Sequence, residues 1–140
     1  MRLMPMLLLL ACGDDGRDSS TTDTAGTTSS TTLTPISHAE VVQPIWEGTC
    51  GATCHLGMSS FGGLSLEGDG RDDLVKVESG QLPSMKLVKP GNLEKSYLWH
   101  KLQNTHVDVG GNGVAMPKVG SLTDDELDII ELWILSGANP

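Results

Sequence analysis

A polar tract over residues 13–37 limits where this chain can fold. Ser and Thr dominate the tract, Asp recurs through it, and no large apolar side chain occurs in it before Leu33. A segment of this composition buries too little apolar surface to offset the entropy lost on ordering, so we expect a disordered tether over residues 12–37. Folding is thereby confined to residues 38–140, a length typical of one small domain.

The first twelve residues, MRLMPMLLLLAC, place one positive charge before an apolar run that ends in Leu-Leu-Ala-Cys. This order resembles the signal and lipobox of bacterial lipoproteins, in which the leader is removed and the next cysteine is lipidated. The run is shorter than the about 20 apolar residues that span a bilayer. The resemblance implies a signal peptide over residues 1–11 and a membrane-attached lipid on Cys12. It also implies a place in the bacterial cell envelope, periplasmic or on the outer face; the alternative is an unmodified Cys12 in a core element.

The chain is acidic, and the acidity belongs to the expected domain. The formal net charge is -9, of which residues 38–140 contribute -7 through 14 acidic and 7 basic side chains. Nucleic acids and anionic lipid head groups attract a surplus of Lys and Arg, so neither is an expected ligand. A protein partner is expected to carry a basic docking surface, with an association that salt weakens.

The last segment of the chain carries the strongest helix signal. Thr123 and Glu126 have the spacing of a capping box, and the acidic residues between them suit a helix N-terminus. An apolar stripe with helical spacing follows, made of Leu127, Ile130 and Ile134. Gly137 can close the helix, so the pattern predicts a helix over residues 124–136.

Two more helices are expected, over residues 38–46 and 93–102. The first contains Val41, Val42 and Ile45 but also Pro44, which weakens its interior. The second carries Leu98 and Leu102 four residues apart, and a helical turn is expected near residues 72–77. No segment alternates apolar and polar residues as a half-buried strand does. We expect an all-α domain of three to four helices joined by long glycine-rich loops.

Cys50, Cys54 and His55 carry the clearest chemical signal. Two thiols followed by an imidazole are what covalent haem attachment requires, since each Cys forms a thioether with a vinyl group and the His binds the iron. The usual spacing is Cys-x-x-Cys-His, and this sequence has one residue more between the cysteines. We predict one haem c on Cys50 and Cys54 with His55 as the proximal ligand. Aromatic residues are only 4% of the chain, so few large side chains are available for the core. The apolar macrocycle of a haem would take their place.

Met116 is the expected distal ligand of that iron. A thioether raises the potential of an electron-transfer haem, and Met116 lies between the glycine run 110–113 and the last helix. Four other side chains compete for the role, namely Met58, Met85, His100 and His106. Met58 is too close to His55 to reach the opposite face, Met85 lacks a following proline, and His100 is expected within a helix. His106 or an open site is therefore the alternative.

The order of these features is similar to the single-haem cytochrome c domains of class I type. The segments that carry the resemblance are Lys89-Pro90-Gly91, Ser96-Tyr97-Leu98 and Met116-Pro117, and it covers residues 39–138. It implies a fold wrapped around one haem with a partly exposed edge, and terminal helices that cross through Ile45 or Trp46 against Ile130 and Trp133. It also implies an electron carrier and not an enzyme by itself, although the protein would suit the electron-transfer subunit of an oxidoreductase.

Two other interpretations of the same residues stay open. Cys50, Cys54 and His55, with Met116, form a soft ligand set that suits copper, which would make the protein a copper-binding lipoprotein. A Cys50–Cys54 disulfide in a structural lipoprotein without a cofactor is the third interpretation. No chemical role is expected for His38. Trp99 and Trp133 are expected in the core, where in a haem domain they could also contact the cofactor.

Overall fold

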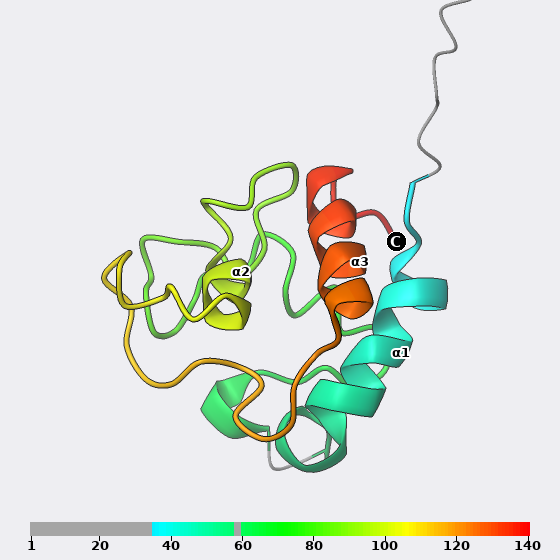
Figure 1. Ribbon diagram of the computed structural model, residues 1–140, viewed down its shortest axis with the longest axis horizontal. Coiled ribbons are helices and arrows are strands. Elements are labelled where there is room, and N and C mark those ends of the chain that lie inside the picture. The colour runs from blue at the N-terminus through cyan, green and yellow to red at the C-terminus, as the bar shows by residue number, and fades with distance from the viewer. Residues whose placement is uncertain (1–34, 58–59) are drawn as a thin grey trace, which may run out of the picture. The chain divides into compact units, whose positions relative to one another are not determined.

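The computed structural model describes residues 35–57 and 60–140, which belong to one compact unit (Figure 1). The predicted signal peptide 1–11, the lipid site Cys12 and most of the tether 12–37 lie outside the described residues, as does Met58. Within the described part, no helix is long and apolar enough to cross a membrane.

The N-terminal helical segment extends beyond the predicted end at residue 46. It consists of the π-helix η1 (His38–Val42), the short α1 (Gln43–Ile45) and the π-helix η2 (Trp46–His55). Pro44 lies in the first turn of α1, where proline is tolerated. Val42 and Trp46 are buried and hold the middle of the segment in the core, so the helix continues through residues whose own helix propensity is low. Both cysteines of the motif therefore lie on a helix.

The second helix, α2 (Tyr97–Leu102), begins four residues later than predicted. The backbone N–H groups of Tyr97 and Leu98 donate to the carbonyls of Lys86 and Leu87, both at 2.9 Å. The Ser96 side chain accepts from the N–H of Lys89 at 2.9 Å. The preceding turn is thus held against residues 86–89 and cannot continue as helix.

The last helix, α3 (Asp124–Leu135), confirms the predicted capping box and ends one residue early. Thr123 Oγ1 accepts from the N–H of Glu126 at 3.2 Å, and a Glu126 carboxylate oxygen accepts from the N–H of Thr123 at 2.7 Å. Two of the backbone donors at the helix start are thereby satisfied.

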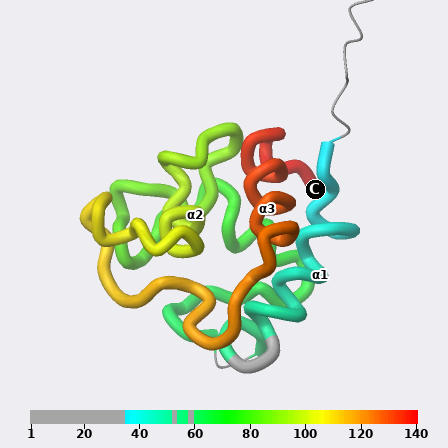
Figure 2. Tube along the Cα trace, viewed as in Figure 1, coloured from blue at the N-terminus to red at the C-terminus, as the bar shows by residue number. Residues whose placement is uncertain are grey.

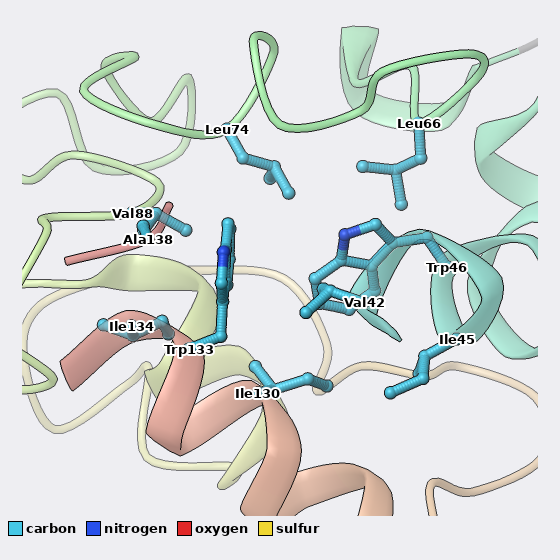
Figure 3. Close-up of a cluster of buried hydrophobic side chains, with 10 residues drawn as sticks. All are labelled: Val42, Ile45, Trp46, Leu66, Leu74, Val88, Ile130, Trp133, Ile134 and Ala138. Atoms are coloured by element: carbon cyan, nitrogen blue, oxygen red, sulfur yellow. The ribbon is translucent and has the colours of Figure 1, made fainter. Parts of the chain in front are cut away.

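The core lies where α3 contacts η1, and Figure 3 shows its side chains. The indole rings of Trp46 and Trp133 meet edge to face, with centroids 6.4 Å apart. Ile130 is fully buried beside them, so the predicted contact between the terminal helices is confirmed. The other members of this cluster are Val42, Ile45, Leu66, Leu74, Val88, Ile134 and Ala138.

The remaining described residues are loops with few regular elements. A 3-10 turn, η4, covers Phe61–Gly63, and the predicted helical turn near residue 72 is a turn closed by the Val75 N–H on the Arg71 carbonyl at 2.8 Å. Three isolated bridges link residues 75–78, 86–88 and 96, and no strand is present in the described part. The all-α class is confirmed there. The predicted wrapping around a haem stays a prediction.

Candidate functional site

His55 is the last residue of η2 and is 9% exposed. Its Nδ1 lies 3.1 Å from the backbone carbonyl of Leu64. Because a carbonyl oxygen only accepts, Nδ1 is the donor in this contact, which leaves Nε2 as the ring nitrogen that can offer a lone pair. Metal-binding histidines characteristically hold their second ring nitrogen in this way, which fixes both tautomer and ring orientation. Nε2 is therefore the ring nitrogen through which His55 could bind a metal.

The two cysteines of the motif are both partly buried on η2. Cys50 packs against the core cluster and is not in a disulfide, so it is not bonded to Cys54. Burial, with smaller contributions from the nearby Glu126 carboxylate and from Cys54, raises the pKa of the Cys50 thiol to about 11. At neutral pH this side chain is uncharged. Residues four apart lie about one helical turn from each other, so Cys50 and Cys54 lie on one side of η2.

Met116 lines a cavity of about 290 Å³ at the start of α3. The cavity is open to the surface and is also lined by residues from the end of α2, from the loop before α3 and from α3 itself, namely Leu102, Pro117, Gly120, Ser121, Leu122 and Leu127. This loop runs in yellow to orange from α2 to α3 in Figure 2. The cavity lining is mixed, with the apolar side chains of Leu102, Leu122 and Leu127 beside the polar Ser121.

The sequence-predicted site residues come together only in part. Cys50 is close enough to Glu126 for the carboxylate charge to raise the pKa of the Cys50 thiol, and Glu126 precedes the cavity residue Leu127. Cys50 and the Met116 cavity therefore both border the start of α3. Cys50, Cys54 and His55 do not themselves line that cavity.

Two of the competing ligands are already engaged or distant. Met85 lines a different cavity, of about 450 Å³, together with the lysines at 86, 89 and 95. His100 uses both ring nitrogens, at 2.9 Å from the Thr105 hydroxyl and at 2.9 Å from the Glu94 carbonyl. Neither lines the cavity that Met116 lines.

The other two histidines of the described part are buried. His106 is 2% exposed, with Nε2 at 3.2 Å from the Gly113 carbonyl and no hydrogen-bond partner for Nδ1. His38 is 1% exposed and has core contacts at both ring nitrogens, 3.1 Å to the Trp46 indole nitrogen and 3.2 Å to the Asp69 carboxylate. His38 is therefore part of the core. Its position at the start of the domain gave no reason to expect this.

Lys101 is the residue near the candidate site that the sequence analysis did not identify. It is 5% exposed, and its ammonium group donates to backbone carbonyls of the loop before Met116. Its spacing of four residues from Tyr97 places both on one face of α2, which is the only sequence signal of its burial.

No group of three His, Cys, Asp or Glu side chains is arranged to hold a metal ion among the described residues. A haem site of the predicted kind would use one imidazole and one thioether, a set that such a group does not include. Comparison of the chain with protein-family models, with curated proteins and with solved structures finds no significant match.

Proposed function

We propose that this protein is an electron carrier of the cell envelope that holds one haem c. Cys50 and Cys54 form the thioether bonds, His55 is the proximal ligand and Met116 is the distal ligand. The observation that carries the proposal is the Cys-x-x-x-Cys-His motif at the end of a helix, with the His55 ring oriented by the Leu64 carbonyl. The fold we propose is the class I cytochrome c type.

The residues present fit such a group. Each thiol would add its S–H across a vinyl double bond, so sulfur bonds to one carbon, hydrogen to the other, and no redox equivalent is consumed. A thioether is uncharged, so the partly buried environment that keeps Cys50 neutral also suits the product. When bound, the haem iron supplies one-electron chemistry. His55 is held at Nδ1 for ligation through Nε2, and Met116 lies beside the apolar side chains of Leu102 and Leu127.

The proposal includes a place and a partner. A lipid on Cys12 would attach the protein to a membrane, and the polar tether would let the domain reach its partner. The net charge of -9 favours a redox partner with a basic docking surface. The rate of electron exchange with that partner should fall as salt is added.

The first test is the visible spectrum of the full chain produced together with a haem-maturation system. We expect sharp bands in the reduced state and haem that stays on the chain in a denaturing gel. The double variant Cys50→Ser/Cys54→Ser should lose this haem, whereas Cys12→Ser, which removes the third thiol, should keep it. A colourless wild-type protein would contradict the proposal, and metal analysis with thiol titration would then separate a copper site from a disulfide.

Met116→Ala tests the distal ligand in the haem-loaded protein. We expect covalent haem with an altered ferric spectrum and a lower reduction potential, because the thioether stabilises the reduced iron. Met85→Ala is the matched control, since Met85 lines the other cavity. An unchanged spectrum in Met116→Ala would favour His106 or an open site.

A further inference from the structure

Lys101 is a buried cation whose partners are carbonyls. Its Nζ donates to the carbonyl of Asn112 at 2.6 Å and to that of Val114 at 2.9 Å, and it lies 5.4 Å from the centre of the Tyr97 ring. None of the ion pairs in the described part of the chain includes it. Burying an ammonium group is costly unless strong hydrogen bonds compensate it. The cost is offset here by two charge-assisted hydrogen bonds and an aromatic face.

The same residue also fixes Met116 through the backbone. The N–H of Met116 donates to the Lys101 carbonyl at 2.9 Å. Lys101 therefore holds alternate residues of one loop, with its side chain at 112 and 114 and with its backbone at 116. The carbonyls of Asn112 and Val114 accept from the Lys101 side chain, so this one residue satisfies loop groups with its side chain and, at Met116, with its backbone.

Neighbouring side chains hold the loop at two further points. The Tyr97 hydroxyl accepts from the N–H of Asn112 at 3.3 Å, and the His106 ring donates to the Gly113 carbonyl at 3.2 Å. A Cβ at Gly111 would overlap the Tyr97 side chain, so the loop approaches α2 as closely as glycine permits. The arrangement fixes one position of the loop.

We infer that Lys101 is a positioning residue that holds Met116 at the wall of its cavity. Leu102, the next residue of α2, lines that cavity together with Met116. Helix α2 therefore both binds the loop, through Lys101, and forms part of the cavity at Met116. The inference rests on the proposed function where it concerns metal ligation. Its structural part, the fixed loop, is independent of any cofactor.

The experiment compares Lys101→Met with Lys118→Met in the full chain. Methionine keeps the length and apolar stem of lysine but cannot donate to the carbonyls. Lys118 is exposed, lies two residues after Met116, and its substitution removes the same charge. Amide hydrogen exchange of residues 112–116 is measured under folding conditions, with exchange of α3 as the reference for global stability.

We expect exchange at residues 112–116 to be about tenfold faster in Lys101→Met than in Lys118→Met, beyond any change in α3. In haem-loaded protein we also expect covalent attachment to survive while the charge-transfer band of methionine-ligated ferric haem weakens. Added imidazole should then bind more tightly than to wild type. If Lys101→Met does not fold, Lys101→Gln gives the same comparison with a smaller expected change, because its amide still donates one N–H.

The outcomes separate this inference from the proposed function. Equal loop exchange in the Lys101 and Lys118 variants would overturn the inference, whether or not the protein binds haem. Faster loop exchange with an undiminished methionine charge-transfer band would overturn the positioning of the ligand. A wild-type chain without haem would refute the proposed function, and the exchange data would still decide whether Lys101 fixes the loop.

Discussion

Ile130 on α3 allows a quantitative test of the packing between the terminal helices. It is fully buried in the cluster that contains Trp46 and Trp133. Ile130→Ala removes three buried carbon atoms, which at about 0.8 kcal/mol each loses about 2.5 kcal/mol of transfer free energy. A residual cavity of about 50 Å³ adds about 1 kcal/mol. We therefore expect a loss of about 3.5 kcal/mol, and a fall in Tm of roughly 15 °C or more.

The assay is urea unfolding followed by tryptophan fluorescence, with Leu132→Ala as the matched control on the same helix. Leu132 is 49% exposed, so its truncation should cost about 1 kcal/mol or less and leave no closed cavity. The midpoint should shift while the denaturant dependence stays constant, since little surface changes in either state. A loss in Ile130→Ala no greater than in Leu132→Ala would refute the assignment of this contact to the core.

Three further predictions concern local contacts, and urea unfolding measures each. Thr123→Ala should cost about 1 kcal/mol by removing the helix cap, and Thr123→Ser should restore most of it; equal stabilities would contradict the capping role. Gln43→Leu should lower the free energy of unfolding by about 2–4 kcal/mol, because the Leu66 carbonyl and the Gly70 N–H would lose the partners that the Gln43 amide provides. An unchanged stability would contradict this. Desolvation by burial lowers the pKa of His38 below 6.5, so the unfolded chain binds more protons below that pH. Stability should therefore fall as the pH decreases through about 6.5, and a parallel fall in His38→Gln would show that another group is responsible.

The sequence predicted best what depends on neighbours in the chain. The α3 helix starts where Thr123 and Glu126 place the capping box, because both hydrogen bonds join residues three apart. The contact between Trp46 and Trp133 followed from the family resemblance and is present, and the structure shows it to be edge to face. The attachment motif and Met116 were also identified from sequence, although the haem they imply stays a prediction.

The helix boundaries that were wrong are those set by distant residues. The N-terminal helix runs on to His55, past the predicted end at residue 46, because Trp46 and Cys50 pack on the core. The start of α2 is delayed because its first N–H groups are taken by residues 86 and 87. Local propensity is a weak guide wherever such tertiary partners compete.

The sequence by itself determined the all-α class and the capped last helix, and it supplied the residues that we propose to carry a cofactor. Only the tertiary structure decided how those residues are held: the Leu64 carbonyl that orients His55, and the Lys101 ammonium that fixes the loop before Met116. It also decided that His38 belongs to the core. The physical reason is that burial and hydrogen-bond partners come from segments brought together by folding, and a residue type does not reveal which carbonyl it will meet.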